Sequence, residues 1–93
     1  MSTRYYPAII ERGDLPEYGV FFPDLPGCTS AGNTLQQAAR NAELAIRGHL
    51  ALMVADGDTI PHPSDLDAIE IDPEVREAAR LLVRVEVPDK AAA

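Results

Sequence analysis

The sequence predicts an α+β fold, a two-layer β-β-β-α-(α)-β domain in which one long helix packs on a small mixed sheet. Short strand-like segments lie before residue 32 and again at 81–87, and apolar residues recur at helical spacing along 34–56 between them. The helix pattern has a single apolar stripe, which needs one sheet face to cover and so gives two layers. The last strand is expected beside the first, reached by a right-handed crossover.

The first expected strand covers residues 4–12, which are rich in Tyr, Ile and Ala. Alternation places Tyr6 and Ile10 on one face and Ile9 on the other. Pro7 lies inside this run and has no N–H to donate to a ladder. The strand therefore needs a free edge or a gap in its pairing at that point.

A hairpin and a third strand are expected next. Residues 13–17 carry turn chemistry between two apolar runs, which predicts a hairpin to a second strand at 18–22. The two prolines and the glycine of residues 23–27 then break the strand. A short third strand follows at 28–31.

The long helix is the clearest element of the sequence. Thr34 and Gln37 have the spacing of a capping box, which satisfies free N–H groups at a helix start. The apolar stripe is expected to consist of Leu35, Ala38, Ala39, Ala42, Ile46, His49, Leu50 and Met53. Gly57 can adopt the left-handed conformation that ends a helix. About 22 residues at 1.5 Å each give a rod of roughly 33 Å.

The rest of the chain is expected to form an extended connector, a short helix and a strand. Prolines keep residues 60–63 extended, and residues 64–67 can start a short helical turn. Asp72 is a good N-cap before a short helix at 73–80. Residues 81–87 alternate as the last strand. One domain is expected over 1–88, with 89–93 as a tail or truncated linker.

Size and charge restrict the possible functions. Ninety-three residues allow one modest core, because a chain this short buries only roughly 60–65% of the surface it exposes when unfolded. The net charge of −7, from eight basic and fifteen acidic residues, argues against direct nucleic acid binding and suits a basic partner. The single cysteine excludes an internal disulfide framework, and no signal peptide or membrane span is evident. We expect a soluble cytoplasmic protein without membrane association.

The titratable residues do not form a convincing catalytic set. His49 lies in the apolar stripe and is expected to be packed, while His62 lies between two prolines and is expected to be solvated. Cys28 has no zinc-ligand spacing to either histidine. Residues 56–77 carry eight acidic side chains, either as a solvated face or as a patch for a cationic partner. No catalytic residue, no metal and no cofactor are expected.

Several motifs in combination resemble the HicB antitoxin family. They are the runs Tyr6-Pro7-Ala8-Ile9-Ile10-Glu11, Tyr18-Gly19-Val20-Phe21-Phe22-Pro23-Asp24-Leu25-Pro26-Gly27-Cys28, Gly32-Asn33-Thr34-Leu35, and Asp56-Gly57 with Ile60-Pro61. The resemblance runs from about residue 5 to residue 64, and more loosely to 87. It implies a partial RNase H-like fold and the antitoxin of a type II toxin–antitoxin system, which neutralises a small basic HicA-type ribonuclease that cleaves mRNA.

The resemblance also suggests partners and contact residues. Most family members carry a carboxy-terminal DNA-binding module, so operator DNA is an expected partner only if such a module exists here. Acidic residues around the hairpin and one aromatic residue are expected to contact the toxin: Glu11, Asp14, Glu17, Tyr18 and Asp24.

Two other functions remain open from the sequence alone. One is a metal-dependent hydrolase on an RNase H-like scaffold, using some of the same acidic residues. The other is a dimerisation module, because an exposed edge of the first or the last strand can pair with a second copy. Beside the toxin, a second copy of the chain is an expected partner, in a homo-oligomer that is a dimer or tetramer.

Overall fold

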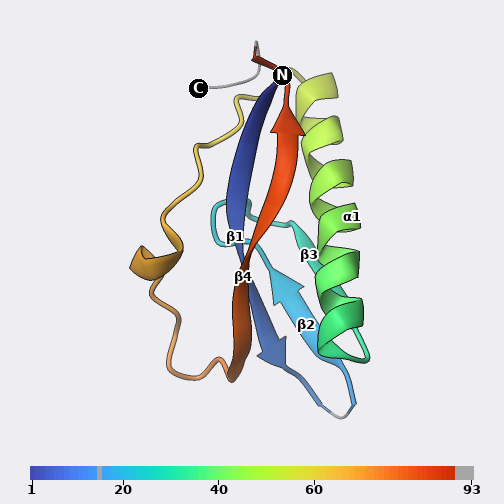
Figure 1. Cartoon of the computed structure of the whole chain (residues 1–93), viewed down its shortest axis with the longest axis vertical. Helices are drawn as coiled ribbons and strands as arrows, with labels where there is room; N and C mark the ends of the chain where they lie inside the picture. The colour runs from blue at the N-terminus through green and yellow to red at the C-terminus, as the bar shows by residue number, and fades with distance from the viewer. Residues whose placement is uncertain (15, 90–93) are drawn as a thin grey trace.

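The computed structural model describes residues 1–14 and 16–89 (Figure 1). Over these residues the elements follow the order strand, strand, strand, helix, short 3₁₀ turn, strand. They are β1 (Ser2–Arg12), β2 (Tyr18–Phe21), β3 (Thr29–Gly32), α1 (Leu35–Ala55), η1 (Leu66–Ala68) and β4 (Glu77–Val87). Residues 90–93 of the predicted tail lie outside the described residues.

The four strands form one sheet in the order β3-β2-β1-β4. The α+β class, the single long helix and the position of the last strand beside the first are confirmed. The expectation of a mixed sheet is wrong, because all three pairings are antiparallel. The handedness rule concerns crossovers between parallel strands. It does not apply to the connection from β3 to β4, since these two strands run in opposite directions.

Pro7 lies in the interior of a central strand, at a place where one side of the strand has no partner. It is opposite Leu82 of β4, whereas the β2 ladder contacts β1 only from Ile9 to Arg12. The missing N–H of Pro7 therefore costs no ladder hydrogen bond on the β2 side. The predicted gap in pairing is confirmed.

The core lies between α1 and the sheet face that carries the even-numbered residues of β1. Tyr6, Ala8 and Ile10 are buried there against four buried helix residues: Ala38, Ala42, Ile46 and Leu50. Thr34 caps the helix as predicted, because its Oγ1 accepts from the Gln37 N–H at 3.0 Å. Leu35 was expected in the stripe but is 42% exposed, since as the first helical residue it has neighbours on one side only.

The predicted helix at 73–80 is wrong. Asp72 does accept from the Glu74 N–H at 2.9 Å, as an N-cap would, but only a tight turn follows. Residues 77–80 are instead the start of β4 and pair with residues 9–11 of β1. A helix of eight residues is marginal by itself, and ladder pairing with a central strand outweighs it. The turn expected from residue 64 is η1, which begins at Leu66.

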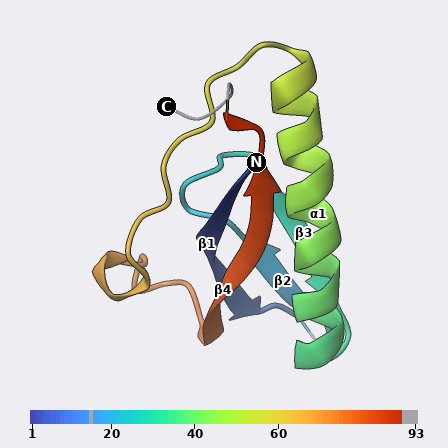
Figure 2. The same ribbon diagram turned by 45° about the horizontal axis from the view of Figure 1, so that its top comes forward.

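A connector of residues 56–76 leads from α1 to the sheet face opposite the helix, which we call the outer face. Figures 1 and 2 agree in placing α1 and most of this connector on opposite sides of the sheet. The connector starts beside the core, where Tyr6 Oη donates to the Pro61 carbonyl. It is held further along by Arg80, which donates to the carbonyls of Leu66 and Ile69 at 2.9 and 3.2 Å. The fold thus presents an outer face that a segment of acidic residues borders.

Candidate protein-binding surface

The described residues contain few groups suited to catalysis. Within residues 1–14 and 16–89, no three His, Cys, Asp or Glu side chains are grouped so that they could hold a metal ion. Cys28 is buried, and this burial raises the pKa of its thiol, so it is packed in the core and lacks thiolate character. His49 is half-buried on α1, and His62 lies exposed in the connector. No helix in the described part of the chain is long and apolar enough to cross a membrane.

Three of the predicted contact residues come together at the end of the β1–β2 hairpin. Glu11, Asp14 and Glu17 line a hollow of about 330 Å³ with two glycines, Gly13 and Gly19. The turn is closed by backbone bonds from Gly13 N–H to the Glu17 carbonyl and from Glu17 N–H to the Asp14 carbonyl, at 3.1 and 3.2 Å. Gly19 pairs with Glu11 across the hairpin and, without a side chain, leaves this hollow open.

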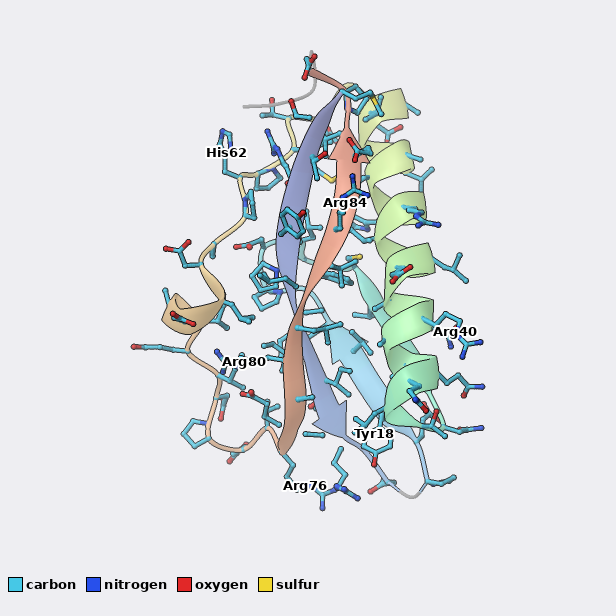
Figure 3. All side chains as sticks on the ribbon, in the orientation of Figure 1. Tyr18, Arg40, His62, Arg76, Arg80 and Arg84 are labelled. Carbon is cyan, nitrogen blue, oxygen red and sulfur yellow. The ribbon has the colours of Figure 1, made fainter. Side chains whose placement is uncertain are left out.

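Two arginines lie close to this acidic hollow. The Arg12 guanidinium lies 5.4 Å from the centre of the Tyr18 ring, a cation–π contact, and Tyr18 is half-buried. Arg76 donates to the Gly13 carbonyl at 3.4 Å. Figure 3 shows Tyr18 and Arg76 at the same end of the molecule. Three acids beside two arginines leave only a small excess of negative charge at the hairpin end.

Asp24 lies apart from the hairpin and has a structural role. Its two carboxylate oxygens accept from Ser64, one from the backbone N–H at 2.8 Å and one from the hydroxyl at 2.6 Å. These bonds tie the Pro23–Gly27 turn to the connector. The structure therefore does not group Asp24 with the other four predicted contact residues.

The outer face carries a patch that contains none of the predicted contact residues. Tyr5 of β1 and Leu82 of β4 are 50% and 47% exposed there. Leu82 lines two adjoining hollows, of about 400 and 500 Å³, and Asp65 lines both of them as well. We call Tyr5, Leu82, Leu66, Asp65 and Asp67 the outer patch. Side chains alternate between the two faces of a strand, and this alternation puts Tyr5 and Leu82 on the side away from the helix; it is the sequence signal that could have identified them.

Comparison with known protein families gives a match that covers nearly the whole chain. Residues 6–92 match the family described as HicB_like antitoxin of bacterial toxin-antitoxin system. Among curated proteins, the chain is similar to an uncharacterized 14.9 kDa protein of the rep-hol intergenic region of Haemophilus phage HP1, with 35% identity over 82 residues. The aligned part covers 88% of this chain and 61% of the phage protein.

Solved structures with the same fold include three antitoxin chains. The N-terminal domain of Burkholderia pseudomallei antitoxin HicB has a TM-score of 0.74 and 28% identity, over 89% of this chain and 99% of that one. A chain of the HicA3 and HicB3 toxin-antitoxin complex has a TM-score of 0.67 and 32% identity, over 90% and 98%. The longer Burkholderia pseudomallei HicB structure has a TM-score of 0.68 and 28% identity, over 96% and 67%.

Proposed function

This chain belongs to the HicB-like antitoxin family of bacterial toxin–antitoxin systems, and from that premise we propose that it binds and neutralises a small basic HicA-type ribonuclease. The observation that carries the proposal is the 32% identity to a chain of the HicA3 and HicB3 complex, over 90% of the residues present here. The net charge of −7 suits a basic partner. The toxin would be neutralised by having its active site covered.

The outer patch is the proposed centre of the toxin contact. Interface centres favour aromatic and large apolar side chains with polar groups around them, and Tyr5 and Leu82 with Asp65 and Asp67 have this composition. The connector adds charge of one sign, because residues 56–74 include seven acids and no Lys or Arg: Asp56, Asp58, Asp65, Asp67, Glu70, Asp72 and Glu74. A cationic ribonuclease is therefore attracted to this face.

The hairpin-end acids have a different proposed role. Glu11, Asp14 and Glu17 lie beside Arg12 and Arg76, so their net field is weak at short range. Together with Tyr18 they form a rim that increases the rate of encounter more than it strengthens the final complex. Asp24 is left out of the proposed contact, because its two hydrogen bonds to Ser64 give it a structural role away from the hairpin.

A binding role without catalysis is proposed, in the cytoplasm where a toxin that cleaves mRNA acts. The family is one of antitoxins, and in the part of the chain that the structure describes no three acidic side chains are grouped so that they could hold a metal ion. A metal-dependent hydrolase is not favoured for these reasons. We treat residues 1–88 as one toxin-binding domain with no cofactor. Because the chain spans 61% of the length of its phage relative, operator DNA is a partner only if a further module follows.

Co-expression with a HicA-type toxin tests the proposed function. We expect the tagged chain to co-purify with the toxin at low salt and to restore growth of cells that express it. Failure to form a complex at low salt would contradict the proposal. A toxin variant without activity serves as the ligand for affinity measurements.

Leu82→Ala and Tyr5→Ala test the outer patch. Each is expected to raise the Kd for the toxin on the order of tenfold or more, as truncation of a central interface residue does. Leu44→Ala is the matched control, since Leu44 is 63% exposed on α1, away from the patch. Isothermal titration calorimetry measures the Kd values, and thermal unfolding shows whether each variant is folded. An equal, small effect of Leu82→Ala and Leu44→Ala would exclude the outer patch.

A further inference from the structure

Arg80 of β4 joins the outer face of the sheet to the connector. Its Nε and Nη2 donate to the two carboxylate oxygens of Glu77 at 2.7 and 2.8 Å. Its Nη1 donates to the carbonyls of Leu66 and Ile69 at 2.9 and 3.2 Å. Figure 3 shows Arg80 between β4 and the connector. Because a guanidinium is planar, the contact with Glu77 also sets the direction in which Nη1 meets the two carbonyls.

A second tie holds the connector just before η1. Asp24 accepts from the Ser64 backbone N–H at 2.8 Å and from the Ser64 hydroxyl at 2.6 Å. The turn that carries Asp24 is fixed to the core, since the next residue, Leu25, is buried and both donates and accepts a backbone hydrogen bond there. Residues 64–69, which we call the anchored segment, are therefore tied near both ends.

The anchored segment provides the connector's part of the outer patch. Asp65, Leu66 and Asp67 all belong to it, and together with Leu82 of β4 they line the hollow of about 500 Å³. Asp65 and Asp67 are exposed, and Leu66 is half-buried. Arg80 bonds only to backbone carbonyls of this segment, so the side chains of the segment remain available to a partner.

The anchored segment has little internal structure of its own. Its only regular element is the 3₁₀ turn of η1, with backbone bonds from Ala68 N–H to the Asp65 carbonyl and from Ile69 N–H to the Leu66 carbonyl, at 3.0 and 3.4 Å. A single turn of this kind is not stable by itself. A segment that is loose before binding must be ordered in the complex, and this cost weakens association even when the final contacts are the same.

We propose that Arg80 and Asp24 are positioning residues for toxin binding. They hold the anchored segment beside Leu82 before the toxin arrives, and they act through this segment rather than by contact with the toxin. The inference rests on the proposed antitoxin function and on the outer patch as the toxin contact. Part of the affinity for the toxin then depends on two side chains that belong to neither the patch nor the hairpin rim.

Arg80→Met and Asp24→Ala each remove one tie. Each is expected to raise the Kd for an inactive toxin variant about tenfold, because the anchored segment must then be ordered on binding. Arg80→Lys keeps the charge but not the planar pair of donors, so it is expected to behave as Arg80→Met does. Arg40→Met and Asp58→Ala are the charge-matched controls at exposed positions, and are expected to leave the Kd nearly unchanged. Isothermal titration calorimetry measures each Kd, at a temperature where thermal unfolding shows that every variant is folded.

A double-mutant cycle separates positioning from a general loss of stability. When Leu66→Ala, Asp65→Asn and Asp67→Asn have removed the patch side chains of the segment, Arg80→Met is expected to raise the Kd by no more than about twofold. A general loss of stability would raise the Kd by the same factor in both backgrounds. In the free chain, amide hydrogen exchange of residues 65–69 is expected to become faster in Arg80→Met and in Asp24→Ala.

The outcomes distinguish this inference from the proposed function. A Kd that does not change in Arg80→Met, an equal factor in the two backgrounds, or unchanged hydrogen exchange of the anchored segment would overturn the inference and leave the antitoxin function intact. If the unaltered chain does not bind the toxin at low salt, the proposed function fails, and the inference fails with it.

Discussion

Gly32 shows how a single residue sets the distance between the sheet and the helix. A Cβ atom at this position would lie 2.5 Å from the Ala38 nitrogen, 2.8 Å from the Ala38 Cα and 2.9 Å from the Gln37 carbonyl carbon. These are backbone atoms of the first turns of α1, which a side-chain rotation cannot move. Only a glycine at the end of β3 allows the helix to begin so close to the sheet.

Gly32→Ala is expected to lower the free energy of unfolding by about 1–3 kcal/mol, because the added methyl group forces β3 and α1 apart. Gly48→Ala is the matched control: nothing lies within 4 Å of a Cβ at Gly48, which is in the middle of α1. Gly48→Ala is expected to raise the free energy of unfolding by up to about 1 kcal/mol, because alanine has a higher helix propensity than glycine. Urea unfolding measures both, and two changes of the same sign would contradict this account.

The local role of a single residue could largely be predicted from the sequence. Contacts between residues that are far apart in the sequence could not. The capping role of Thr34 follows from a four-residue pattern and is confirmed by its hydrogen bond. The need for glycine at position 32 depends on the Ala38 backbone, which only the folded chain brings near. The tie between Asp24 and Ser64 likewise joins residues forty positions apart, and no local pattern signals it.

At the scale of elements, β4 shows where a correct local signal gives the wrong structure. Asp72 accepts a hydrogen bond as an N-cap would, yet the predicted helix at 73–80 does not form. Glu77 and Arg80, three residues apart, make the ion pair that a helix would also allow, with distances of 2.7 and 2.8 Å. These residues form a strand because they pair with β1, which lies more than sixty residues earlier in the sequence.

This ion pair predicts a dependence of stability on pH. Hydrogen bonds from Arg80 lower the pKa of Glu77 from its usual value. A carboxylate with a lowered pKa in the folded state stabilises fully above its unfolded pKa, and this contribution is lost as the pH falls through the folded value. Glu77→Gln should therefore lower the urea midpoint near pH 7. Below about pH 4.5 the variant should lose less additional stability than the unaltered chain, because it has no carboxylate at this position to protonate. Equal pH profiles for the variant and the unaltered chain would contradict the role of this pair.

At the scale of the whole molecule, the two faces of the sheet have different surroundings. One face is covered by α1 and forms the core, and the other is bordered by the acidic connector. Composition predicted the acidic surface and a basic partner. It did not predict which face carries most of the charge, because the connector could be placed only once the hydrogen bonds of Arg80 and Tyr6 were known.

The overall charge predicts how salt affects association with the toxin. Changing Glu11 and Glu17 to Gln and Asp14 to Asn reduces the net charge from −7 to −4, since three acids are removed. The association rate constant at low salt is expected to fall several-fold, while the dissociation rate changes little. Stopped-flow mixing at about 50 and 500 mM salt measures both rates. A change confined to dissociation would instead place these residues inside the contact.

The pairing of β1 with β4 has a consequence for synthesis on the ribosome. Ser2 is opposite Val87, so the strand made first completes its ladder with the strand made last. The 65 residues from Arg12 to Glu77 take about 3–13 s to translate at bacterial and eukaryotic elongation rates. Throughout that interval Tyr6, Ala8 and Ile10 lack their β4 neighbours. During this time the apolar side chains of β1 must not form wrong contacts. A chain translated from an mRNA that is cut before the β4 codons cannot form the complete sheet.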